Sequence, residues 1–122
     1  MTTIKIKRVY EKEAKSDGFR VFVDRLWPRG IKKEDLHFDL WEKGITPSSE
    51  LRTWYHEDTE ERWKEFAKKY RKELEQADTI DGFLSKIAGH QTITLLYAAK
   101  DEHQNHTLVL KDFLETLLSH EK

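Results

Sequence analysis

Cysteine is absent from the sequence, which excludes disulfide bonds, thiolate catalysis and cysteine-ligated zinc. No apolar run approaches the roughly 20 residues needed to span a bilayer. The polar start, MTTIKIKRVY, also lacks the apolar core of a secretory signal. These three absences together predict a cytoplasmic protein with no membrane partner.

Net charge is almost absent as well, because 22 Lys and Arg residues face 23 Asp and Glu residues, for a formal charge of −1. A chain so close to neutral has no general attraction to nucleic acid, although a local basic patch is compatible with it. Charged residues still make up 37% of the chain, and its aromatic residues fall in periodic segments, which predicts a folded protein. No repeat or flexible linker marks a boundary, so we expect residues 1–122 to form one compact domain.

Alternating apolar and polar residues predict two strands near the start of the chain, at residues 3–10 and 19–24, with a turn at KSDG between them. LHFDLW, residues 36–41, alternates in the same way and is a candidate edge strand. The nearly continuous apolar run TITLLYAA, residues 92–99, is typical of a strand buried on both faces. We therefore expect this last strand to be central.

Apolar residues at three- and four-residue spacing predict four helices. Thr46 is the expected N-cap of the first, with Pro47 at its first helical position. The second begins at Asp58 and runs through WKEFAKKYRKEL, and the third ends at Gly89. Asn105 is positioned to cap the last helix.

Strands separated by long amphipathic helices predict an α/β domain, with a small, mainly parallel sheet flanked by helices on both faces. A crossover from residues 19–24 through the helices to residues 92–99 would make those two strands parallel. The sequence leaves the direction of the first strand open.

Charged side chains gather where the predicted strands end. VDRLWPRG, residues 23–30, places two guanidiniums, a carboxylate and a tryptophan where a plain turn would use Gly, Asn, Asp or Ser. Open α/β sheets bind ligands beyond the carboxyl ends of their strands, so we expect a pocket there, with Arg8 included only if the first strand is parallel. The candidate ligand-binding residues are Arg8, Arg25, Trp27, Arg29, Arg52, Lys100, Asp101 and Asn105.

The basic members of this set predict a site for an anionic group, because an arginine fork matches phosphate or carboxylate oxygens. Asp24 and His56 are candidate catalytic residues, the first as a general base and the second for proton exchange near neutral pH. Asp24 can equally form a structural ion pair with Arg25, and His56 can simply interact with a helix dipole. The sequence leaves both interpretations open.

His103, His106 and Asp101 match no strong metal-ligand spacing, so we predict neither metal nor cofactor. Two classes of function remain. One is a pocket, enzymatic or not, for an anionic small molecule such as a nucleotide, sugar phosphate or carboxylate. The other is a nucleic-acid or protein-interaction module that stacks on Trp27 and Trp54, which the near-zero net charge disfavours. Substrate, reaction and oligomeric state stay open.

The segments KRVYE, GFRVFVDRLWPRG, DLWEKGITPSSELRTWYH, WKEFAKKYRKEL and TLLYAAKDEHQNH resemble, in this order, the YeaO-like family, a group of small bacterial proteins whose activity is uncharacterised. The resemblance covers nearly the whole chain and implies a compact single-domain α/β protein. Some members carry a transcription-regulator label, but this chain shows no winged-helix order of elements. Thr59 stands where the resemblance leads us to expect proline. The recurring polar positions that it implies are Arg8, Arg20, Asp24, Arg25, Arg29, Lys32, Arg52, His56, Asp101 and Asn105.

Overall fold

The structure, a computed structural model, describes residues 2–120. Within this range a four-stranded sheet runs in the order β1-β4-β2-β3, and all of its strand pairs are parallel. Its strands are β1 (Thr3–Arg8), β2 (Phe19–Phe22), β3 (Leu40–Trp41) and β4 (Thr92–Tyr97). The α-helices of the same range are α1 (Ser49–His56), α2 (Thr59–Gln76), α3 (Thr79–Ile87) and α4 (His106–His120). None of the described helices is long and apolar enough to cross a membrane.

β4 lies inside the sheet, as the sequence predicts, between β1 and β2. It is apolar on both faces: Leu95 and Leu96 point to opposite sides, and both are fully buried. The predicted parallel pairing with β2 is confirmed, with Val21 opposite Leu95. β1 is also parallel to β4, which settles its direction.

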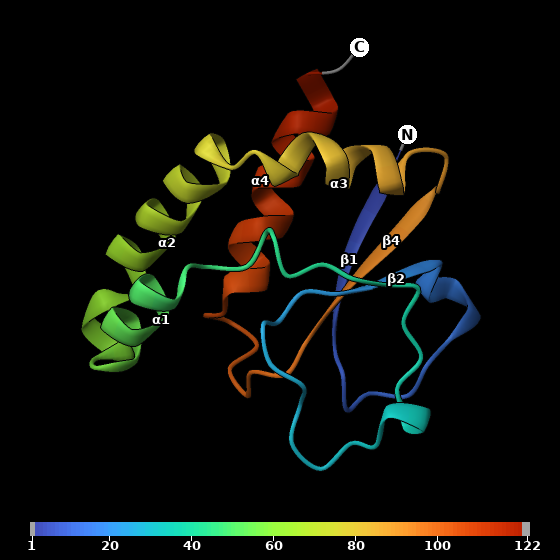
Figure 1. The fold of residues 1–122 in the computed structure, drawn as a ribbon, viewed down its shortest axis with the longest axis horizontal. Coiled ribbons are helices and arrows are strands. Elements are labelled where there is room, and N and C mark those ends of the chain that lie inside the picture. Colours follow the sequence, from blue (N-terminus) through green and yellow to red (C-terminus); the bar gives the residue numbers. More distant parts are fainter. Residues whose placement is uncertain (1, 121–122) are drawn as a thin grey trace.

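The two faces of the sheet are covered differently. All four α-helices pack on the face that carries Val21 and Leu95, and Figure 1 shows them grouped on one side of the strands. Our expectation of helices on both faces was therefore wrong. Phe22, on the opposite face, is covered by Trp27 and Trp41, whose ring centroids lie 5.8 and 5.2 Å from its own. Large aromatic side chains, from the turn after β2 and from β3, supply the apolar area that a helix would otherwise provide.

α1 begins two residues later than predicted. Ser48, not Thr46, is its N-cap, because the Leu51 amide donates to Ser48 Oγ at 3.1 Å. The Ser48 hydroxyl and amide in turn donate to the Glu73 carboxylate of α2, which holds the cap in place. Pro47 thus lies outside the helix, and its carbonyl is free to accept a hydrogen bond from elsewhere.

The other helix ends match the predictions. The Glu61 amide donates to Asp58 Oδ1 at 3.2 Å at the start of α2. Asn105 Oδ1 accepts from the Thr107 and Leu108 amides at 3.0 and 3.2 Å and so caps α4. These caps satisfy amides that have no partner inside their helices.

A buried ion pair lies on the face of the sheet away from the helices. Asp17 and Arg20 are 3% and 2% exposed; their carboxylate and guanidinium are in direct contact. Lys7 Nζ adds a bond of 2.7 Å to Asp17, and Arg20 Nε donates to the His37 carbonyl at 2.8 Å. Burial raises the pKa of Asp17, but the donors from Lys7, Ala14 and Arg20 outweigh it, so the pKa is lowered. Arg20 therefore stabilises the fold.

Candidate functional site

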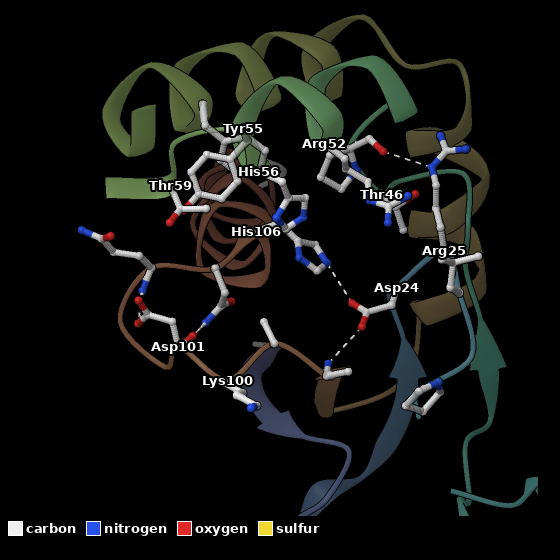
Figure 2. Close-up of a pocket in the computed structure, with 18 of the residues that line it drawn as sticks. Asp24, Arg25, Thr46, Arg52, Tyr55, His56, Thr59, Lys100, Asp101 and His106 are labelled. Atoms are coloured by element: carbon white, nitrogen blue, oxygen red, sulfur yellow. Dashed lines mark hydrogen bonds and ion pairs between the residues drawn. The ribbon is translucent and has the colours of Figure 1, made fainter. Parts of the chain in front are cut away.

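A cavity of about 670 Å³ lies where the carboxyl ends of β2 and β4 meet the start of α4. α1, the start of α2 and the turn at residues 24–29 complete its walls. Figure 2 shows Arg25 and Arg52 on one side of it and Lys100 and Asp101 on the other. All of the predicted site residues except Arg8 line this cavity, namely Asp24, Arg25, Trp27, Arg29, Arg52, His56, Lys100, Asp101 and Asn105.

Arg8 does not line the cavity. β1 is parallel to β4, so Arg8 reaches the same edge of the sheet. Its Nε donates to the Ala99 carbonyl at 2.9 Å and its Nη2 to the Ala98 carbonyl at 3.3 Å. Its guanidinium also lies over the Tyr10 ring, 4.8 Å from the centroid. In this structure Arg8 therefore binds the backbone of the lining residues Ala98 and Ala99.

Asp24 lines the cavity, and its contacts differ from the ion pair with Arg25 that the sequence allowed. Its Oδ2 accepts from the Ala98 amide at 2.9 Å, and its Oδ1 lies 3.2 Å from His106 Nε2 (Figure 2). His106 Nε2 is also 2.9 Å from the Val23 carbonyl. Asp24 forms no ion pair with Arg25. The carboxylate thus joins the ends of two strands and the first residue of α4.

His106 lines the cavity, but in the sequence analysis it was weighed only as a candidate metal ligand. It directly follows the Asn105 cap and the loop after the central strand, and that position was the available signal. Tyr10 and Tyr55 also line the cavity but were not predicted as site residues. Among residues 2–120, no group of three or more His, Cys, Asp or Glu side chains is placed to hold a metal ion.

Four basic side chains line the cavity: Arg25, Arg29, Arg52 and Lys100. Within the described chain none of them lies in an ion pair; Arg25 Nε donates instead to the Pro47 carbonyl at 3.0 Å. Of the arginines that do not line the cavity, Arg20, Arg62 and Arg71 pair with Asp17, Glu57 and Asp112, whereas Arg8 donates to backbone carbonyls. The cavity therefore gathers arginines whose charge the protein itself does not pair.

The acidic side chain of Asp101 is turned toward the backbone. Its Oδ1 accepts from the His103 and Gln104 amides at 2.8 and 3.0 Å, and these bonds lower the pKa of Asp101. Asn105 Nδ2 donates to the Asp101 carbonyl at 2.9 Å, which fixes the same loop. Asp24, Glu60 and Asp101 thus add negative charge to the cavity lining, but within the described chain none of them forms an ion pair with its arginines or lysine.

α1 contributes both a buried and an exposed side chain to the cavity. Tyr55 is buried and stacks on Phe66 with ring centroids 4.3 Å apart. Burial, and then the charge of Asp101, raise the pKa of Tyr55, so its hydroxyl keeps its proton at neutral pH. His56, the predicted proton-exchange residue, is exposed in the last turn of α1.

The tryptophans proposed for stacking are occupied by contacts within the protein. Trp27 Nε1 donates to the Ile31 carbonyl at 2.6 Å, and its ring packs edge-on against Trp41. Trp54 lies outside the cavity, with Lys69 Nζ 4.2 Å and the Arg62 guanidinium 4.7 Å from its ring centroid. Trp27 is therefore both one of the aromatic residues that cover Phe22 and a lining residue of the cavity.

Comparison with known proteins gives consistent matches. A family model described as "Inactive DUF488-N3 subclade" matches residues 3–122. "Uncharacterized protein YeaO" of Escherichia coli (strain K12) is 50% identical over 114 residues, covering 93% of this chain and 98% of that protein. "Uncharacterized protein Rv3073c" of Mycobacterium tuberculosis is 40% identical over 113 residues, covering 93% and 94%. No solved structure matches significantly. The chain therefore belongs to the YeaO-like family, in the group described as the inactive DUF488-N3 subclade.

Proposed function

We propose that the protein binds a small molecule bearing a phosphate or carboxylate group in the cavity at the ends of β2 and β4. One observation carries this proposal: Arg25, Arg29, Arg52 and Lys100 line the cavity without a carboxylate partner in the described chain. A guanidinium or ammonium group with no ion-pair partner is free to form charge-assisted hydrogen bonds with a bound anion. In this proposal a ligand anion forms the ion pairs that these basic side chains do not form with the lining carboxylates Asp24, Glu60 and Asp101.

The position of the cavity supports the same proposal. It lies beyond the carboxyl ends of parallel strands, where α/β sheets bind their ligands. The amino terminus of α4 adds little, because Asn105 already accepts from the Thr107 and Leu108 amides. Recognition of the anion therefore depends on side-chain charges from the turn, from α1 and from the loop after β4.

We propose binding without chemical turnover. The family description contains the word "Inactive", which favours a binding role. The contacts of Asp24 point the same way, since its Oδ2 is engaged by the Ala98 amide and its Oδ1 faces His106. A carboxylate used to hold strand ends together is poorly placed to accept a substrate proton. In this proposal Asp24 is a positioning residue and His56 lies at the rim.

A nucleic-acid module is the second candidate and has less support. The ring of Trp54 is covered by Lys69 and Arg62, and Trp27 is packed against Trp41. Single-strand binders need exposed aromatic faces beside a basic groove. Binding to a random oligonucleotide at two salt concentrations discriminates the two, because phosphate contacts along a strand give a steep salt dependence.

The direct test is a titration of the protein with inorganic phosphate, followed by amide shifts in two-dimensional NMR, with sodium chloride at matched ionic strength as the blank. We expect saturable shifts at Arg25, Arg29 and Lys100. Arg52→Gln should weaken phosphate binding by about tenfold or more, since it removes a charged donor.

Arg71→Gln is the matched control, because Arg71 lies outside the cavity and pairs with Asp112 at 2.6 Å. It should leave the affinity for phosphate unchanged. Shifts that do not saturate, or equal weakening by Arg52→Gln and Arg71→Gln, would contradict the proposal.

A further inference from the structure

Two exposed apolar side chains lie beside the unpaired basic groups. Tyr10 and Leu26 are 48% and 68% exposed, and they are the exposed large hydrophobic residues among residues 2–120. Both line the cavity. Single exposed apolar side chains are common on protein surfaces. Their coincidence at the cavity that also gathers the unpaired cations needs a further reason.

Packing within the protein does not supply that reason for Leu26. Neither Leu26 nor Tyr10 belongs to the two hydrophobic clusters of the described chain. Leu26 directly follows Arg25 in a turn where any polar residue would be well solvated. An apolar side chain there leaves apolar area in water at a free-energy cost, which a ligand can recover by covering it.

Tyr10 is held in place before any ligand binds. Its hydroxyl donates to the Arg29 carbonyl at 3.0 Å, and the Arg8 guanidinium lies over its ring. The ring is therefore fixed to the turn that carries Leu26 and Arg29. Arg8 occupies one face of this ring, but Tyr10 is still 48% exposed, which leaves aromatic surface for contact with a ligand ring.

The size of the cavity fits a ligand much larger than a bare phosphate ion. Its volume of about 670 Å³ lies within the range of about 300–1,000 Å³ that is typical for drug-sized organic ligands. The basic groups also surround the cavity, since Arg25 and Arg52 lie on one side and Lys100 on another (Figure 2). A phosphate contacting one of these sides leaves room for the rest of a molecule.

We infer that the ligand is an organic phosphate that carries an aromatic ring, as nucleotides and aryl phosphates do. This inference rests on the proposed anion site. The phosphate group is bound by the basic side chains, and the ring lies against Tyr10 and Leu26. The apolar rim then selects among phosphate esters that the charges alone would bind equally.

The test compares methyl phosphate with phenyl phosphate, which share the charged group and differ in the ring. Each is titrated by calorimetry into the full chain. We expect phenyl phosphate to bind about tenfold tighter, from the apolar area that the ring covers. Leu26→Ser should bring the ratio of the two affinities toward one, and Leu26→Met, which keeps an apolar side chain, should preserve it.

Each remaining outcome is decisive. Equal affinity of the two esters overturns the ring inference and leaves the anion site intact. A phenyl phosphate preference that Leu26→Ser does not change also overturns it. Failure of both esters to bind contradicts the anion site itself. Because Leu26 is exposed, its substitution leaves the folded state available for every measurement.

Discussion

His106 Nε2 lies 2.9 Å from the Val23 carbonyl and 3.2 Å from Asp24 Oδ1. A carbonyl only accepts, so Nε2 carries the ring proton in the neutral histidine. Asp24 Oδ1 is buried and has no other partner, whereas Oδ2 accepts from the Ala98 amide. One carboxylate and one imidazole thus fix the meeting point of β2, β4 and α4.

Asp24→Ala should therefore lower the free energy of unfolding by about 1–3 kcal/mol, because the Ala98 amide loses its acceptor. Asp24→Asn should cost less, since an amide oxygen can accept the same bond. Urea denaturation of the three proteins measures both effects. A wild-type stability for Asp24→Ala would show that the contact does not stabilise the fold.

The same substitution should affect the stability of the protein very differently at two arginines. Arg20→Gln should cost about 3–5 kcal/mol of stability, because it leaves the buried Asp17 without its main partner. Arg52→Gln should stay within about 0.5 kcal/mol of the wild type, since no ion pair is lost. Chemical denaturation of both variants provides the comparison, and similar losses would contradict the assignment of Arg52 to ligand binding.

Asp17 should titrate below its ordinary pKa of 3.8 in the folded protein, because Lys7, Ala14 and Arg20 donate to it. Between the folded and the unfolded pKa, the unfolded chain binds more protons. The stability from this group is therefore complete above pH 3.8 and is lost as the pH falls through the folded value. Carboxyl carbon NMR follows the titration. Lys7→Met, which removes a donor at 2.7 Å, should raise this pKa; an unchanged value would contradict the cause.

Two glycines make a matched pair for backbone substitution. Gly18 has a φ of 66°, and a Cβ there would lie 2.4 Å from the Thr92 carbonyl oxygen. Gly18→Ala should destabilise the protein by about 1–3 kcal/mol from backbone strain, with the steric clash in addition. Gly82, in α3, has open space around its Cα, so Gly82→Ala should stabilise by about 0.5–1 kcal/mol. The midpoint of thermal denaturation should fall for Gly18→Ala and rise for Gly82→Ala.

The sequence was most informative where apolar residues follow one simple pattern. β4 and α2 could be predicted because burial leaves a continuous run in one and a stripe in the other. The cap of α1 could not, because Thr46 and Ser48 are both good capping residues. The choice is made by Glu73 of α2, which accepts from Ser48. The cover of the second sheet face was missed because Trp27 lies in a turn without a period, and the alternation of residues 36–41 does not show which sheet face Phe38 and Trp41 cover.

The position of the candidate site could be predicted from the parallel topology, since strand ends meet at one edge. The contacts inside it could not. Asp24 is bonded to Ala98, 74 residues away in the sequence, and Val23 to His106, 83 residues away. Local patterns pair Asp24 with its neighbour Arg25, but the folded chain offers Arg25 the Pro47 carbonyl instead. These partners come together only in the folded chain, so local sequence patterns could not predict them.

The strand order has a consequence for biosynthesis. β1 leaves the ribosome first, yet its pairing partner is β4, near the far end of the chain. β1 and β2 do not pair with each other, so β1 stays without its partner until β4 has been synthesised. Such distant pairing slows folding and leaves nascent strands open to misassociation. The alternating lysines of β1, Lys5 and Lys7, oppose the association of this unpaired strand with other chains.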